Sequence, residues 1–176
     1  LLAGGVVPER AARSLARLTS WIVGAGGTVV VPEGAGLAAN PAFAAALDIS
    51  PGLAPSLAHG EYARPGFHVM EAPTGHWTES VSGLGATGIG ILLAYAGEHP
   101  LQGHPMIPML QVTGDRGVAA AYADDLDAVV DADEGVGGQQ LLDLLVETAS
   151  QRLRPRLWDQ GNTDFQITRG LLGVSM

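Results

Sequence analysis

The fold is decided by the stretch from Phe67 to Asp115, which reads FHVMEAPTGHWTESVSGLGATGIGILLAYAGEHPLQGHPMIPMLQVTGD. Its pattern predicts a strand, a loop, a short helix, a strand, a loop and a strand. The segments FHVM and ILLAYA are short apolar runs bounded by proline and glycine, which is typical of strands buried on both faces of a parallel sheet. The polar side chains fall in the loops after these strands. In an open α/β sheet, that edge is where ligands bind.

The flanking sequence continues this alternation of strands and helices. Apolar residues at helical spacing predict one helix from Pro8 to Val23 and a clearer one from Gln139 to Leu153. Asn40 followed by Pro41 predicts the start of a short helix. TVVVPE and LDAVVDAD are predicted strands, GVAAAYADD is a short helix, and ISPGLAPSLAHGEYARPG is a long loop. We therefore expect residues 1–176 to form a single α/β domain, a Rossmann-like three-layer lobe with a mainly parallel sheet.

The composition limits the possible functions and locations. The formal charge of −9 argues against nucleic-acid binding, which requires clustered cations. No apolar run approaches the roughly 18 residues of a membrane-spanning helix, and the start lacks the charged region of a signal peptide. The absence of cysteine excludes thiol chemistry and fits a cytoplasmic protein. Only 15% of residues are charged and the mean hydropathy is +0.22, so we expect part of the surface to be buried against another chain or domain.

The segment TGHWTES holds an informative group of polar side chains. We expect Thr78 to cap the helix that follows, which places His76 and Glu79 beside the helix N-terminus. Free N–H groups and the helix dipole favour an anion there, so a substrate carboxylate would fit. The three-residue spacing of His76 and Glu79 is compatible with a shared metal or an acid/base pair. It is equally found in surface polar groups without a function.

A second polar loop, GEHPLQGHP, carries His99 and His104 after the strand ILLAYA. Together with Glu98 they are either ligands of a divalent metal or solvated side chains in a loop stiffened by proline. We interpret His59 and His68 as structural. The later acidic residues form either a hard-cation site or a solvated acidic face; they are Asp124, Asp125, Asp127, Asp131, Asp133 and Glu134.

The glycine cluster GLGATG, at positions 83 to 88, has the spacing of the dinucleotide-binding fingerprint. That fingerprint requires the glycines to follow a strand and open a helix. Here they follow the predicted helix and precede the strand ILLAYA. We therefore interpret them as glycines that stop the helix and permit tight packing.

These segments resemble the altronate dehydratase and galactarate dehydratase family. The large domain of that family carries F-M-D-T-P-G-x-D-P-E-S-V-T-G, a strand, and T-T-G-R-G-T-P-x-G-x-P-x-x-P, where this chain has VMEAPTGHWTESVSG and AYAGEHPLQGHPMIP. GGTVVVPE looks like the family's G-G-T-V-x-L-S-E, YADDLD resembles M-x-D-D-M-D, and the ending FQITRGLLGVSM looks like the family's closing segment. The matching positions are Glu33, Glu71, Pro73, Glu79, Ser80, Val81, Gly83, Gly97, Gly103, Pro105 and Pro108.

The resemblance implies the C-terminal, Rossmann-like domain of a metal-dependent dehydratase (hydro-lyase). Such enzymes convert a sugar acid such as altronate or galactarate into a 2-keto-3-deoxy acid with a divalent metal, Fe²⁺ first and Mn²⁺ or Mg²⁺ as alternatives. The resemblance implies Glu33, Glu71 and Glu79 as metal ligands. It assigns acid/base work to His76, Glu79 and Glu71. The implied substrate-binding residues are Ser80, Thr78, His99 and His104.

Three departures from the family pattern keep an alternative open. Gly97, Glu98, His99 and Pro100 stand where the family has G-R-G-T-P, so an acid replaces an arginine suited to clamping a carboxylate. The segment between the first two matching motifs is shorter, and the half that precedes them in the family is not in this sequence. We expect the chain to associate with such a half or with copies of itself. The alternative is a non-catalytic assembly or small-ligand-binding domain that keeps the fold.

Overall fold

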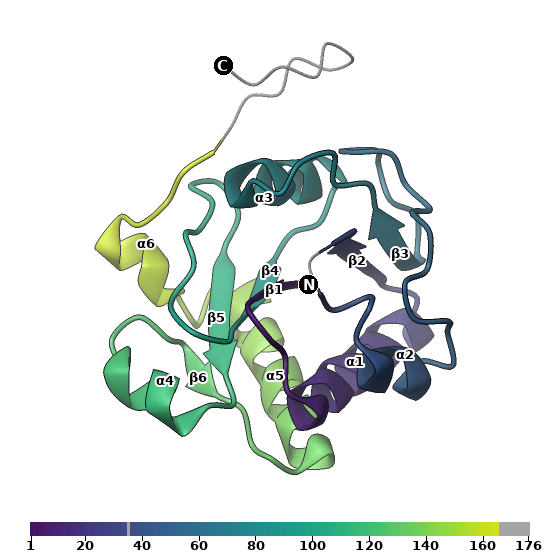
Figure 1. Cartoon of the computed structure of the whole chain (residues 1–176). Helices are drawn as coiled ribbons and strands as arrows, with labels where there is room; N and C mark the ends of the chain where they lie inside the picture. The colour runs from purple at the N-terminus through teal and green to yellow at the C-terminus, as the bar shows by residue number, and fades with distance from the viewer. Residues whose placement is uncertain (35, 166–176) are drawn as a thin grey trace.

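The structure is a computed structural model that describes residues 1–34 and 36–165 (Figure 1). The chain forms an α/β lobe in which strands and helices alternate, as the sequence predicts. The elements are β1 (Leu2–Gly4), α1 (Glu9–Gly24), β2 (Thr28–Pro32), α2 (Pro41–Ala46), β3 (Gly66–Met70), α3 (Trp77–Ala86), β4 (Leu92–Ala96), β5 (Met109–Thr113), α4 (Arg116–Ala121), β6 (Ala128–Val129), α5 (Glu134–Ala149) and α6 (Arg156–Gln160).

All the strand pairs are parallel. One sheet has the order β1-β4-β5-β6, and β2 and β3 form a second pair. The two sheets meet between β1 and β2, where the amino group of Leu1 donates to the carbonyl of Val30 at 2.6 Å. Side chains of both sheets share the same two core clusters. The lobe therefore contains a four-stranded parallel sheet and a two-stranded parallel pair that share one core.

Helices cover both faces of these strands and complete the three layers. Helices α1, α2 and α5 pack on one face, where the core includes Leu15, Phe43 and Leu141. Helices α3 and α6 pack on the other face through Leu84 and Leu157. Figure 1 shows α1, α2 and α5 grouped on one side and α3 on the opposite side. Burying each of these large apolar side chains contributes about 1.5–3 kcal/mol, so the faces are held mainly by the hydrophobic effect.

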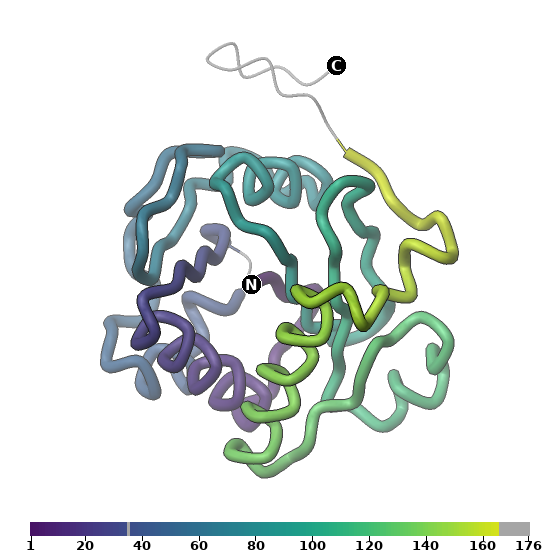
Figure 2. Tube along the Cα trace, turned by 180° about the vertical axis from the view of Figure 1, so that it is seen from behind, coloured from purple at the N-terminus to yellow at the C-terminus, as the bar shows by residue number. Residues whose placement is uncertain are grey.

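The close packing of α1 against α5 depends on the glycine at position 137. Figure 2, the view from behind, shows these two helices side by side. A Cβ atom at Gly137 would lie 2.7 Å from the hydroxyl of Ser14, whereas one at Gly138 would make ordinary van der Waals contact with the indole of Trp21 at 3.4 Å. The absence of a side chain at Gly137 lets the helix backbones approach at this point. The predicted start of the helix at Gln139 is wrong because Asp133 accepts from two backbone N–H groups and begins the helix before these glycines.

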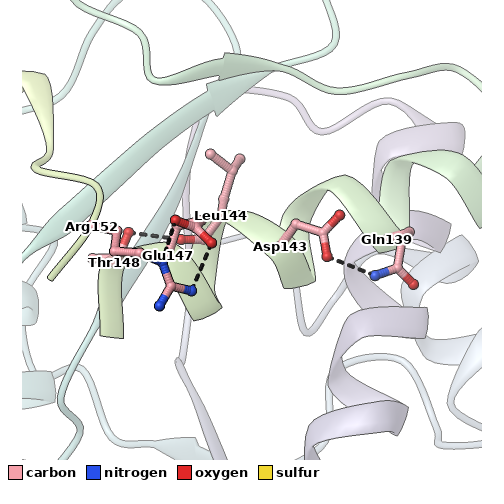
Figure 3. A network of polar contacts seen from close by, with 6 residues as sticks. All are labelled: Gln139, Asp143, Leu144, Glu147, Thr148 and Arg152. Atoms are coloured by element: carbon pink, nitrogen blue, oxygen red, sulfur yellow. Dashed lines mark hydrogen bonds and ion pairs between the residues drawn. The ribbon is translucent and has the colours of Figure 1, made fainter. Parts of the chain in front are cut away.

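The polar and apolar sides of α5 separate as its sequence predicts. Figure 3 shows the polar contacts along the helix: Gln139 donates to Asp143 at 2.8 Å, and Arg152 makes two bonds to Glu147 at 2.8 and 2.9 Å. The opposite stripe lines an open, mostly apolar groove of about 450 Å³, together with the end of α1 and the loop before β4. Val146 in this groove is 47% exposed and Tyr62 is 74% exposed.

Several expected elements are confirmed, and others differ in their bounds or burial. Helix α2 begins where Asn40 accepts from the N–H groups of Ala42 and Phe43, as expected. All five residues of β4 are buried. Strand β3 is an edge strand whose first three residues are only half-buried, so the expectation of burial on both faces is wrong for it. The short elements β1 and α6 were not predicted, and the closing segment beyond Phe165 lies outside the described residues.

Among the described helices, none combines the length and the apolar composition that crossing a membrane requires.

Candidate ligand-binding site

A cleft of about 570 Å³ opens at the carboxyl edge of β1, β2 and β3. Its walls come from the segment after β2, the segment after β3 and the first turns of α3. The polar side chains that line it are Glu33, Thr74, Trp77 and Ser80. Apolar residues of β1 complete the lining. Ligands of open α/β sheets bind at this edge, so the cleft is the candidate functional site.

The loop before α3 is fixed by a pair of hydrogen bonds to one hydroxyl group. The Oγ1 atom of Thr74 accepts from the backbone N–H of His76 at 3.2 Å and donates to the carboxyl group of Glu79. Glu79 is only 9% exposed, and its side chain does not line the cleft. Glu79 therefore positions the cleft loop through Thr74.

The expectation that Thr78 caps this helix is wrong. Helix α3 begins at Trp77, and His76 is the N-cap residue. Thr78 thus lies inside the first turn, where its hydroxyl is 3.5 Å from the side-chain oxygen of Gln102. The helix begins earlier because Thr74, and not Thr78, satisfies an N–H group at its start.

Replacing Thr74 by valine should lower the free energy of unfolding by about 1–2 kcal/mol, because it leaves the buried Glu79 carboxyl without its hydroxyl donor. Urea denaturation followed by circular dichroism measures this change. Thr74→Ser keeps the hydroxyl and should lose less than half as much. Equal losses in the two variants would mean that packing of the threonine methyl group, and not the hydrogen bond, stabilises the loop.

The indole of Trp77 forms a fixed wall of the cleft. Its ring N–H donates to the backbone carbonyl of Gln102 at 2.5 Å, which ties α3 to the loop after β4. The ring is half-buried and lines the cleft. Sequence reasoning missed Trp77 and Thr74, although both lie within the polar segment that it selected. Their roles depend on contacts that only the folded chain makes.

Glu33 lines the cleft directly after β2. Its backbone N–H donates to the carbonyl of Met70 at 2.7 Å, which continues the pairing of β2 with β3. The side chain is exposed, and among the residues that line the cleft it is the only charged one. Glu33 and Ser80 are therefore the two predicted site residues that the fold brings to the cleft.

Other predicted site residues lie outside the lining of the cleft. Glu71 follows β3, where its backbone N–H donates to Leu57 at 2.9 Å and its side chain is exposed. Its carbonyl faces the ring Nδ1 of His59 at 3.2 Å. His99 is exposed in the loop after β4. His76 lies at the rim, between two residues that line the cleft.

The described residues do not fit a complete metal site. Glu79 is engaged by Thr74, and Glu71 lies outside the cleft that Glu33 faces. Across residues 1–34 and 36–165, no three or more His, Asp or Glu side chains gather closely enough to hold an ion. A divalent metal stays a prediction of the family resemblance.

The acidic run has structural contacts at several of its positions. The carboxylate of Asp127 accepts from the N–H groups of Gln111 at 2.7 Å and Arg156 at 3.0 Å, and burial raises its pKa. Asp133 caps α5, and Asp131 accepts from the N–H of Asp133 at 2.8 Å. Asp127, Asp131 and Asp133 thus hold backbone N–H groups in place, a role that neither the cation site nor the solvated acidic face predicted.

His104 lies in the core and not in the cleft. It is 3% exposed, its ring Nδ1 accepts from the N–H of Met106 at 3.1 Å, and its carbonyl accepts from the indole of Trp158 at 3.1 Å. Removal from water lowers the pKa of this imidazole below its usual value of 6.5. His104 therefore stabilises the fold in its neutral form.

This burial predicts a pH dependence of stability. Because the folded-state pKa of His104 is depressed, its contribution is complete above pH 6.5 and is lost as the pH falls toward the folded-state pKa. His104→Asn retains an acceptor for Met106 without titrating. Relative to this variant, the native chain should lose stability below pH 6.5 with a slope of at most about 1.4 kcal/mol per pH unit. Urea titrations at pH 7.5, 6.5 and 5.5 measure the difference; parallel losses would contradict the prediction.

A second crevice of about 370 Å³ lies at the start of α1, beside the ends of β4, β5 and β6. The hydroxyl of Tyr95 there accepts from the N–H of Gly114 at 3.1 Å. The charged residues of its lining are Glu9, Arg10 and Asp131, and Glu9 pairs with Arg13 at 2.5 Å. None of the site residues that the family resemblance implies lines this crevice, so the cleft beside α3 is the better candidate.

No model of a known protein family matches the chain, and a search of curated proteins found no match.

Proposed function

We propose that the chain is the substrate-binding lobe of a sugar-acid dehydratase. The observation that supports this is the meeting of two segments at one cleft. GGTVVVPE supplies Glu33, and VMEAPTGHWTESVSG supplies Thr74, Trp77 and Ser80. Both segments carry the family resemblance, and they are far apart in the sequence.

The proposed reaction is the loss of one water molecule from a 2,3-dihydroxy acid. A base takes the proton from the carbon next to the carboxylate, and the electron pair of that C–H bond forms a double bond to the next carbon. The C–O bond of the neighbouring hydroxyl breaks, and this oxygen leaves as water after it takes a proton. The resulting enol tautomerises to the 2-keto-3-deoxy acid. A well-placed base accelerates such a step by roughly 10²- to 10⁴-fold.

His76 is the proposed base. It is exposed at the N-cap of α3, between Gly75 and Trp77, which both line the cleft. Histidine is the side chain that most often serves as a general base in enzymes. Ser80 and the first-turn N–H groups of α3 would receive the substrate carboxylate, since that helix end carries a partial positive charge. Glu79 holds the loop in place through Thr74.

The proposal includes a cytoplasmic location and association with a second copy or another lobe. The open groove along α5, with Val146 and Tyr62 exposed, supports the association because water contact with apolar side chains is unfavourable. Light scattering over a range of protein concentrations tests it. A monomer at all concentrations would contradict self-association.

The test of the proposed function is an anaerobic assay for 2-keto-3-deoxy acids, with a panel of aldonates and aldarates as substrates. Reactions would contain Fe²⁺, Mn²⁺ or Mg²⁺, and parallel reactions would contain a chelator. Product from at least one acid would support the dehydratase. A folded protein that forms no product from any acid would contradict catalysis by this chain.

One observation favours an alternative, a small-ligand-binding or assembly domain without catalysis. Glu98 is exposed where the family has an arginine, so a cation suited to the substrate carboxylate is missing there. Binding of a sugar acid without product would support this alternative.

A further inference from the structure

The polar groups of the cleft beside α3 come from two elements. The first turns of α3 contribute the hydroxyl of Ser80 to the lining. The segment after β2 contributes the exposed carboxylate of Glu33. The lining residues include no arginine and no histidine. A bound molecule with one negative charge, received by the start of α3, therefore suits this lining better than a molecule with two.

Glu33 accepts hydrogen bonds but has none to donate when it is ionised. A terminal CH₂OH group can donate its O–H to Glu33 in a charge-assisted hydrogen bond. A second carboxylate at the same position has no proton to give at neutral pH, and it meets a like charge without a neighbouring cation in the lining. At about 4 Å, two such charges repel by about 1 kcal/mol even in bulk water.

Trp77 provides an aromatic surface in the same lining. Its indole is held by the hydrogen bond to Gln102, so the ring does not need to be ordered when a ligand binds. The face of an aromatic ring carries partial negative charge, which attracts the weakly positive C–H groups of a polyol. An uncharged hydroxylated chain can therefore lie along the ring and reach Glu33.

We infer that the cleft takes the uncharged polyol end of a sugar acid, and that it selects acids with one carboxylate over acids with two. Glu33 is the residue that makes this selection, and Trp77 is the surface on which the polyol lies. The inference rests on the proposed function, and it specifies the substrate class as aldonates in preference to aldarates.

Galactonate and galactarate form a matched pair of probes, because they differ only in CH₂OH or carboxylate at the last carbon. Isothermal titration calorimetry at neutral pH would measure both affinities, once with a chelator and once with Mn²⁺. We expect galactonate to bind at least about fivefold more tightly, the factor that corresponds to the repulsion between two charges near a solvated surface. Equal affinities, or a preference for galactarate in either condition, would overturn the inference.

Three variants assign the effect to individual residues. Glu33→Gln removes the charge and should bring the ratio of the two affinities to about one. Glu98→Gln makes the same change of net charge at an exposed residue outside the cleft and should leave the ratio unchanged. Trp77→Phe should weaken both ligands by the same factor. An unchanged ratio in Glu33→Gln would overturn the role of Glu33.

The binding test and the product assay separate the inference from the proposed function. Preferential binding of galactonate without product in the assay would leave the selection intact and contradict the dehydratase. Product from galactarate as readily as from galactonate would support the dehydratase and overturn the selection. Failure of both acids to bind would contradict both.

Discussion

Replacing His76 by glutamine should lower the turnover number for an aldonate by about 10²- to 10⁴-fold, the usual contribution of a general base. The imidazole is exposed at the start of α3, and this N-cap residue makes no capping hydrogen bond with its side chain. The free energy of unfolding should therefore change by less than about 0.5 kcal/mol, as for most surface substitutions. Steady-state kinetics and urea denaturation of the same preparation measure the two effects.

His68→Gln is the matched control for the His76 substitution. His68 lies in β3, where its ring nitrogens face the carbonyl of Arg64 at 2.9 Å and the hydroxyl of Ser56 at 3.4 Å. It does not line the cleft, so its replacement should leave the turnover number within about twofold. If both variants retained full turnover, His76 would not be the base. The carboxylate of Glu33 would then be the next candidate base to test at the cleft.

Replacing Gly97 by alanine should lower the free energy of unfolding by about 2–3 kcal/mol, near the upper end of typical overpacking costs. A Cβ atom at Gly97 would lie 2.8 Å from the carbonyl oxygen of Gly4, 2.9 Å from that of Val6 and 3.2 Å from the N of Val6. Gly4 belongs to β1, which pairs with β4, and Val6 belongs to the loop after β1. Their backbone atoms cannot rotate away as the end of a side chain can. Urea denaturation at neutral pH measures the loss.

Gly90→Ala is the control for Gly97→Ala. A Cβ atom at Gly90 meets no atom within 4 Å, and its backbone is not in the left-handed region. The substitution should change the free energy of unfolding by less than about 0.5 kcal/mol. Equal losses in the two variants would contradict the view that close approach of β1 and β4 requires glycine at position 97.

The sequence predicted the longer and more regular elements well. The continuous apolar run of β4 needs no tertiary context, because five consecutive apolar residues between glycine and proline signals are compatible with few other structures. Strand β1 was missed because three residues are too few for a periodic pattern. Its strand conformation depends on pairing with β4, in which Leu2 lies opposite Ala94. The start of α5 was missed because its first turns are rich in glycine, and Asp133 compensates for this as the cap.

The candidate site was predictable only in part. The resemblance selected Glu33 and Ser80, which line the cleft. It also selected Glu71, which does not line the cleft and whose backbone N–H donates to the carbonyl of Leu57. The role of Trp77 depends on the hydrogen bond from its indole to the carbonyl of Gln102, which is 25 positions away in the sequence. Gln102 reaches α3 only when the loop after β4 folds back. Contacts between loops cannot be derived from local sequence patterns.

The strand order has a consequence for the way the chain is made. Strand β1 is synthesised about ninety residues before its partner β4, as the pairing of Leu2 with Ala94 shows. Until β4 emerges from the ribosome, β1 lacks its partner in the sheet, and contacts of such long sequence separation form slowly. The nascent chain should thus be vulnerable to aggregation during translation and should depend on chaperones at this stage. Slower elongation before β4 would lengthen this period and reduce the yield of folded protein.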